Sequence, residues 1–267
     1  MDISLILAFL ALGAAVGFAA GLLGVGGGLL LVPFFTFLFT LKGVPGDLLV
    51  HMAIATSLAT IMFTSISSVL AHHQRSAVSW HIVKVLAPGI LIGSWIGPWI
   101  GKQLNSAALA MFFAVFVAIS ATQMLLDKKP AASRDLPRAL GMFAAGGVIG
   151  ILSGLVGAGG GFVSVPFMTW CNVKIHNAVA TSAALGFPIA LAGTFSNIYY
   201  GMNTTDLPPG SLGFVYLPAL LVVSLASVFT APFGARTAHG LPVKSLQKVF
   251  ALSLFALGGY MLYKVLR

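Results

Sequence analysis

The chain has 267 residues, of which 58% are hydrophobic and only 7% are charged, and its mean hydropathy is +1.02. A soluble domain carries about a quarter charged residues, so this composition excludes an ordinary soluble protein and is typical of a polytopic membrane protein. In a soluble protein the formal charge of +9 would suggest a nucleic-acid partner. Here the basic residues lie mostly in short loops between apolar segments, which indicates membrane orientation and no nucleic acid.

Ten apolar segments follow one another and predict an all-α membrane protein with eight to ten spans. They cover residues 3–22, 24–40, 47–71, 82–101, 106–126, 138–157, 159–172, 177–201, 213–234 and 245–265. The polar stretch 127–137 separates two halves, 3–126 and 138–265. We expect this stretch to be a cytoplasmic linker within one integral membrane domain, 1–267.

The two halves share a glycine-rich motif. In the first half it comprises Gly24, Gly26, Gly27, Gly28 and Pro33, and 133 positions later it recurs as Gly157, Gly159, Gly160, Gly161 and Pro166. A second motif pairs His51, Thr56 and Ser57 with His176, Thr181 and Ser182, now 125 positions apart. Such duplication is typical of membrane transporters built from two structural repeats.

Charge placement predicts that the repeats are inverted. If each glycine-rich pair of segments returns to its starting side, ten basic residues fall on one face and four on the other. If each pair crosses once, the division is eight against six. Because cytoplasmic loops are enriched in Lys and Arg, the first arrangement is favoured, with both termini outside the cytoplasm.

The consecutive glycines predict a break between two short helices, with Pro33 and Pro166 acting as helix-breaking residues. Irregular backbone survives at membrane depth only where protein or a polar cavity surrounds it. Such a break presents N–H groups and the positive end of a helix, so we expect two facing breaks to bind an anion. Glycines spaced by four, such as Gly13 and Gly17 or Gly89, Gly93, Gly97 and Gly101, are instead assigned to helix packing.

Polar residues near the motifs have two interpretations. Thr56, Ser57, Thr181 and Ser182 either bond to their own helix carbonyls or donate to a substrate oxygen. His51 and His176 are helix-start residues or protonatable groups on the substrate path. Asn197, which aligns with His72, caps the site or merely packs.

The acidic residues are five aspartates, and all of them lie at segment ends or in loops. An intramembrane sodium site or acidic proton relay is therefore missing from the pattern, which argues against cation transport. We find no hydrolytic nucleophile with its base, no metal-ligand cluster and no cofactor motif, so we do not expect an enzyme. Lone Cys171 is expected to be inert packing.

The two intact copies of the glycine motif, each followed by Ala-x-Ala-Thr-Ser (residues 53–57 and 178–182), resemble the TauE/SafE family of sulfite exporters over essentially the whole chain. The loop at residues 75–80 is similar to the family's R-x-G-x-V-D-W but departs from it at Ser76 and Ser79. The resemblance implies export of sulfite or a small organosulfonate across the bacterial cytoplasmic membrane.

The leading hypothesis is a secondary permease that moves a small anion by alternating access. Its substrate would bind at the glycines of the two motifs together with the matched Thr-Ser pairs. A passive anion channel and a membrane partner protein that transports nothing are the alternatives. Gly-x-x-x-Gly faces would allow a homodimer, although packing within the chain uses such faces equally well.

Overall fold

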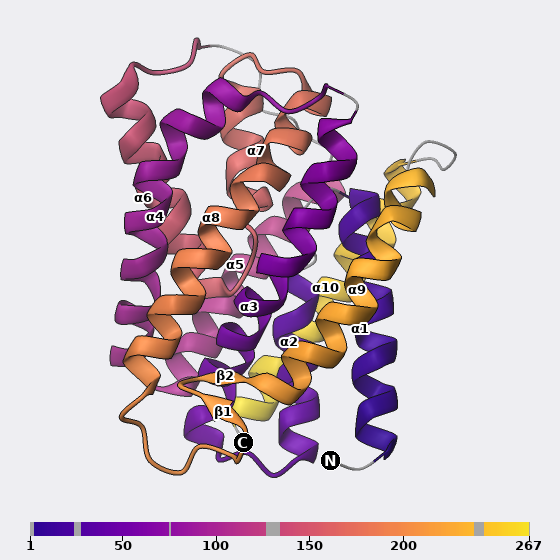
Figure 1. Ribbon diagram of the computed structural model, residues 1–267, viewed down its shortest axis with the longest axis vertical. Coiled ribbons are helices and arrows are strands. Elements are labelled where there is room, and N and C mark those ends of the chain that lie inside the picture. Colours follow the sequence, from indigo (N-terminus) through magenta and orange to yellow (C-terminus); the bar gives the residue numbers. More distant parts are fainter. Residues whose placement is uncertain (1–2, 24–27, 75, 127–133, 238–242, 267) are drawn as a thin grey trace.

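The described residues of the computed structural model, 3–23, 28–74, 76–126, 134–237 and 243–266, form ten helices and one short hairpin (Figure 1). The helices match the ten predicted apolar segments, so the all-α membrane fold is confirmed. Their bounds are α1 Ile3–Leu23, α2 Gly28–Leu41, α3 Gly46–His73, α4 Trp80–Gln103, α5 Ser106–Leu126, α6 Ala139–Val156, α7 Gly161–Trp170, α8 Ile175–Gly201, α9 Leu217–Thr237 and α10 Val243–Leu266. The antiparallel strands β1 (Ser211–Leu212) and β2 (Val215–Tyr216) lead into α9.

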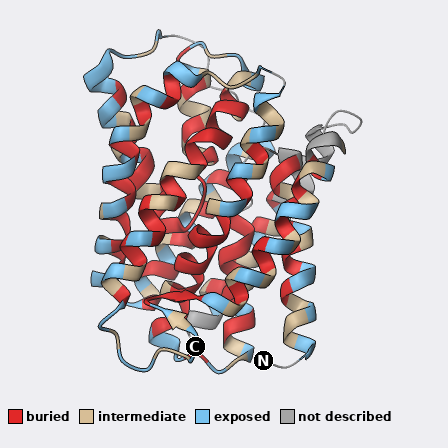
Figure 2. Cartoon of the chain, in the orientation of Figure 1, coloured by how far each residue is buried: buried red, intermediate tan, exposed pale blue. Residues whose placement is uncertain are grey.

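Helices α3 and α8 form the centre of the molecule and pack against each other. Within the most apolar 18 residues of each helix, 83% of the residues of α3 and 72% of those of α8 are buried, whereas only 33% are buried in α1 and in α5. The outer helices instead expose large apolar side chains, among them Ile3, Leu140 and Phe229. Figure 2 shows the same division, with buried residues concentrated at the centre. Seven of the described helices are long and apolar enough to cross a bilayer, and exposed apolar faces of this kind suit contact with lipid.

Several contacts between two helices have a counterpart between the two helices that correspond to them in the sequence repeat. Helix α4 packs on α6 as α9 packs on α1, and α4 contacts α8 as α9 contacts α3. The contact of α2 with α3 likewise has its counterpart in that of α7 with α8. The chain also begins and ends at the same end of the molecule (Figure 1).

Glycine allows the close approach of the α4–α6 and α1–α9 pairs. A Cβ on Gly93 would overlap the carbonyl oxygen of Gly147 in α6, and one on Gly97 would lie 2.8 Å from that of Ile151. In the other pair, a Cβ on Gly13 would lie 2.6 Å from the carbonyl oxygen of Val223. The packing assignment is thus confirmed for these glycines, and their faces are used within the chain, so they provide no argument for a homodimer.

Each glycine motif separates a long helix from a short one, where two short helices were predicted. Helix α1 has 21 residues and α6 has 18, whereas α2 has 14 and α7 only 10. At 1.5 Å per residue α7 extends about 15 Å, roughly half of the hydrocarbon core, so it cannot complete a crossing.

The two prolines do not break these helices, contrary to the prediction. Pro33 and Pro166 each lie inside a continuous helix, at the sixth residue of α2 and α7. A proline removes only its own N–H bond to the carbonyl four residues earlier, and here that carbonyl belongs to the first turn. In the second motif the backbone therefore leaves helical geometry at the glycines and not at Pro166.

The glycine contacts between helices predict opposite effects for two helix substitutions. Gly259→Ala in α10 meets open space, so it should stabilise the protein by up to about 1 kcal/mol through helix propensity. Gly93→Ala gains the same propensity but forces α4 away from α6, so we expect a net loss of about 1–3 kcal/mol. Thermal unfolding of both purified variants in detergent measures this difference. A Gly93→Ala variant as stable as Gly259→Ala would contradict the packing assignment.

Candidate functional site

The two glycine motifs meet at the centre of the protein. A Cβ on Gly28, the first residue of α2, would lie 2.8 Å from the Ala158 Cα and 2.9 Å from the carbonyl oxygen of Gly157. Conversely, a Cβ on Gly157 would lie 2.9 Å from a methyl group of Val32 in α2. The first motif's remaining predicted site residues, Gly24, Gly26 and Gly27, lie outside the described residues. The described part of the first motif therefore contacts the second motif directly.

The second break is built from two glycines in left-handed backbone conformation. Gly157 (φ +71°) ends α6, and Gly160 (φ +76°) precedes the first residue of α7. Other residues pay roughly 1–2 kcal/mol for this conformation, which explains why glycine is required at both positions. All residues from Ser153 to Gly161 are buried, Gly159 included, so the break is enclosed by protein.

The matched serines bond to different parts of the second motif and the helix that follows it. The Ser57 hydroxyl of α3 donates to the carbonyl oxygen of Gly157 at 2.7 Å and lies 3.5 Å from that of Gly28, so it contacts both motifs. The Ser182 hydroxyl of α8 accepts a 2.8 Å hydrogen bond from Ser164, the fourth residue of α7. The structure thus places Ser57 at the glycine motifs and Ser182 beside α7, and neither hydroxyl is seen bonding to its own helix.

The matched threonines bind the segments that lead into α4 and α9. The Thr181 hydroxyl accepts the backbone N–H of Ser79 at 3.0 Å, and the Thr56 hydroxyl accepts that of Tyr216 at 3.1 Å. Each threonine therefore holds the residue that directly precedes a helix of the other half. An accepting hydroxyl keeps its own hydrogen for a further bond. Since the bond uses the backbone of Ser79, the chain's departure from the family's loop pattern at this position leaves it intact.

Ser153 of α6 was missed by sequence reasoning, because it lies in an apolar helix and has alanine (Ala20) as its counterpart in the first half. Its side chain is 2% exposed, and its hydroxyl has no hydrogen-bond partner in the described structure. A Cβ on Gly160 would lie 3.0 Å from this hydroxyl oxygen, which places the hydroxyl against the turn that starts α7. Only the three-dimensional structure shows that it faces the break.

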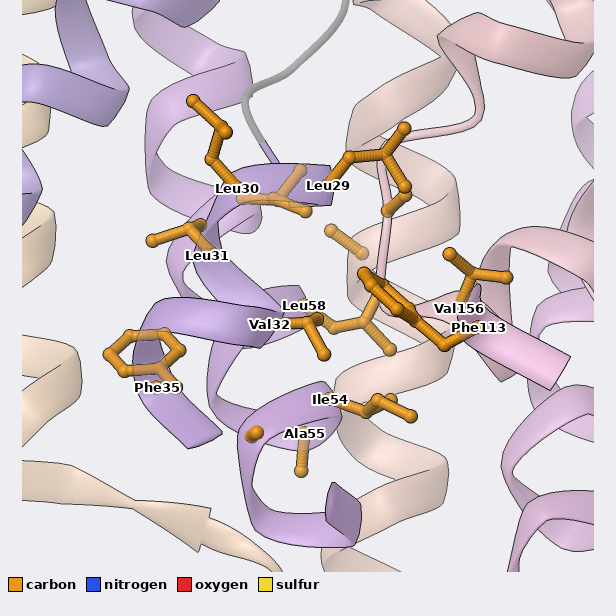
Figure 3. Packing of buried hydrophobic residues seen from close by; sticks show 14 of the residues in the cluster. Leu29, Leu30, Leu31, Val32, Phe35, Ile54, Ala55, Leu58, Phe113 and Val156 are labelled. Atoms are coloured by element: carbon orange, nitrogen blue, oxygen red, sulfur yellow. The ribbon is translucent and has the colours of Figure 1, made fainter. Parts of the chain in front are cut away.

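Apolar side chains surround the polar groups of the site. Leu29 and Val32 of α2, Ile54 and Leu58 of α3, and Val156 of α6 belong to one buried cluster (Figure 3). A Cβ on Gly160 would also overlap the end of the Ile189 side chain of α8. These side chains shield the two breaks from water and strengthen electrostatic interactions within them.

The histidines and Asn197 lie apart from the break. His51 bonds through Nε2 to the carbonyl oxygens of Gly101 and Leu104 at 3.1 Å each, which ties the start of α3 to the end of α4. His176 is exposed in the first turn of α8. The Asn197 side chain is buried and donates to the Gly193 carbonyl of its own helix at 2.8 Å. None of these three contacts the glycine motifs in the hydrogen bonds of the described residues.

The buried polar residues are uncharged. Among the residues whose burial the structure describes, those with buried polar side chains are Ser, Thr and Asn197, with no Asp, Lys, Arg or His. The described residues also contain no cluster of metal-ligating side chains. Outside the spans, burial raises the pKa of the Cys171 thiol and disfavours its reactive thiolate. The polar groups described at the site are therefore neutral, namely backbone peptide groups and hydroxyls.

Comparison with known proteins identifies membrane transporters. A family model described as sulfite exporter TauE/SafE matches residues 9–261. A probable membrane transporter protein of Haemophilus influenzae is 39% identical over 97% of this chain and 98% of its own length. A second one, from Methanocaldococcus jannaschii, is 28% identical over 94% of this chain and 92% of its own length. No solved structure matches the chain.

The contact of Ser57 with both motifs predicts a structural effect. Ser57→Ala leaves the buried Gly157 carbonyl without its 2.7 Å donor, so we expect a loss of about 1–2 kcal/mol. Ser120→Ala is the matched control, because this buried serine bonds only to the Phe116 carbonyl of its own helix and should change stability by less than about 0.5 kcal/mol. Thermal unfolding in detergent compares the two variants. Equal stabilities would show that Ser57 does not hold the break.

Proposed function

The chain belongs to the sulfite exporter TauE/SafE family, and from this membership we propose that it is a secondary permease that exports a small anion, such as sulfite or an organosulfonate. It is a multi-pass membrane protein whose relatives are named probable membrane transporters. The substrate, the alternating-access mechanism and the site residues are our proposal.

The meeting of the two glycine motifs carries this proposal. Helix α7 begins at the second motif, and the first N–H groups of a helix have no acceptor within it. Two carbonyl oxygens at this break are engaged: that of Gly157 accepts from Ser57, and that of Ser153 accepts the N–H groups of Gly157 and Ala158 at 2.9 and 3.1 Å. We propose that the positive end of α7 at this break favours an anionic ligand.

Because the described buried residues carry no charge, we propose that the substrate is a monoanion. The solvation energy lost on entering a low-dielectric site rises with the square of the charge, and here no described buried cation compensates it. Neutral donors therefore suit a monoanion such as hydrogen sulfite or a sulfonate better than a dianion such as sulfate. A sulfonate, which carries one charge at all physiological pH values, is the clean probe of this class.

Burial of the break supports a carrier over an open channel. In a conducting pore the residues that line the path are accessible to water, whereas Gly28 and residues 153–161 are all buried. The threonine bonds to Ser79 and Tyr216 further tie each half to a segment of the other. We propose that transport breaks these bonds in turn, so that the central break opens first to one side and then to the other. A passive channel remains the alternative, and transport against a sulfonate gradient would exclude it.

We further propose that the protein lies in the bacterial cytoplasmic membrane as an inverted repeat, with both termini outside the cytoplasm. The termini share one end of the molecule (Figure 1). Helices α2 and α4 run towards that end, and Lys42 follows α2 while Lys102 lies in the last turn of α4. The starts of α4, α6 and α8 lie at the opposite end, where Lys84 is the fifth residue of α4 and Arg138 and Lys174 directly precede α6 and α8. Positive charge gathers on the cytoplasmic side of membrane proteins, so the end without termini is assigned to the cytoplasm.

Substitution of a glycine in the break tests the site. Gly160→Ala places a side chain in the left-handed region beside Ile189, so it should reduce methanesulfonate flux in proteoliposomes at least tenfold. Gly43→Ala is the matched control, since Gly43 has φ +81° but is exposed and has open space around it. The Gly43→Ala variant has the same backbone strain and should transport methanesulfonate at the normal rate. Equal flux in both variants would contradict the site assignment, and faster transport of sulfate than of methanesulfonate by the unsubstituted protein would contradict the substrate class.

Thiol labelling tests the orientation. In a Cys171→Ser background, a cysteine replacing exposed Asn203, in the loop between α8 and α9, should react with a membrane-impermeant maleimide in spheroplasts. A cysteine replacing exposed Asp135, before α6, should react only after the membrane is opened. The reverse labelling pattern would show that the termini face the cytoplasm.

A further inference from the structure

We propose that Ser153 positions the transported anion, and that the binding site is therefore built mainly from the second half of the chain. This inference rests on the proposed function, since it names a residue and a location within the same site. It starts from the unpartnered hydroxyl of Ser153, which is 2% exposed, in the last turn of α6.

Hydroxyl groups in the other helices usually have an acceptor within the same helix. Thr36, Thr60 and Ser120 each donate to the carbonyl oxygen four residues earlier, at 2.8 Å. A serine in mid-helix can always reach such a carbonyl, so this bond is the default way to satisfy a hydroxyl in an apolar environment. Ser153 does not make it, although leaving a buried hydroxyl unpaired is costly. A ligand that accepts from Ser153 explains why the hydroxyl points away from its own helix.

The position of this hydroxyl fits an anion at the start of α7. Its oxygen lies 3.0 Å from where a Cβ on Gly160 would be, and Gly160 immediately precedes α7. The ten-residue helix α7 directs its positive end at this turn. The Ser153 carbonyl is engaged by Gly157 and Ala158, and the hydroxyl, which has no partner in the described structure, can donate to a ligand at the break. In the closed arrangement the side chain of Ile189 covers this turn and has to move for a ligand to enter.

The first half lacks the corresponding donors. At the repeat offset of 133 positions Ser153 corresponds to Ala20, and Ser164, which donates to Ser182, corresponds to Leu31. Ala20 and Leu31 are both buried and apolar. The hydroxyls of Ser153 in α6 and Ser164 in α7 thus have no counterpart at the matching positions of α1 and α2. We infer that the anion binds nearer to α6 and α7 than to α1 and α2.

A binding experiment on the purified full-length protein tests this assignment. Methanesulfonate affinity is measured by tryptophan fluorescence or calorimetry for the unsubstituted protein, Ser153→Ala and Ser224→Ala, with thermal unfolding of each in the absence of anion. Ser224 is the matched control because its hydroxyl in α9 is likewise buried without a partner in the described structure. Both alanine variants remove an unpaired hydroxyl, so both should unfold at the same or a higher temperature than the unsubstituted protein. Only Ser153→Ala should bind methanesulfonate more weakly, by roughly tenfold or more for the loss of a hydrogen bond to a charged group.

Two results would overturn the inference. Unchanged methanesulfonate affinity in Ser153→Ala would show that the hydroxyl does not contact the anion. A lower unfolding temperature of Ser153→Ala without anion would show that the hydroxyl has a structural partner instead. Failure of the proposed function is seen separately, because the unsubstituted protein would then neither bind nor transport methanesulfonate.

Discussion

A stretch of irregular backbone, residues 157–160, lies at the centre of this membrane protein between α6 and α7, and its peptide groups have to be satisfied without water. An unpaired peptide group in hydrocarbon costs several kcal/mol, so interrupted helices survive only where protein supplies partners. Here α3 supplies one, since the Ser57 hydroxyl donates to the carbonyl of Gly157, while Ser182 of α8 bonds to the side chain of Ser164 in α7. This requirement explains why Ser57 lies in α3, which has the highest buried share among the candidate spans.

The threonine bonds connect the central site to both ends of the molecule. Thr56 and Thr181 hold the backbone immediately before α9 and α4, and those two helices pack along α1 and α6 through glycine contacts. We propose that a rearrangement at either threonine moves a whole helix pair, because close-packed interfaces transmit displacement. The symmetry of these contacts gives the molecule two equivalent anchoring points, which is what alternation between two open sides requires.

The sequence was sufficient to predict the helices, the duplication and the location of the breaks, because glycine triplets and apolar length are local signals. It also singled out Ser57, whose hydroxyl bonds to the carbonyl of Gly157 in the second break. Partners that come from distant helices could not be predicted in this way: the bond from Ser79 to Thr181 spans 102 positions, and nothing in either neighbourhood indicates it. The prolines were misassigned because a proline near a helix start costs one hydrogen bond and does not end the helix.

Under our proposal, Ser153 gives a duplicated fold a one-sided binding site. Duplication fixes matched backbone geometry, since the glycines, α7 and its counterpart α2 depend on conformational requirements that both halves share. Side chains facing the breaks have no such constraint, and an alanine in one half can be a serine in the other without disturbing packing. A buried hydroxyl without a partner destabilises the protein, and our proposal assigns its presence at the second break, against the positive end of α7, to binding of the anion. In this proposal the repeat provides the mechanism of movement, while its departures from symmetry provide the recognition of the substrate.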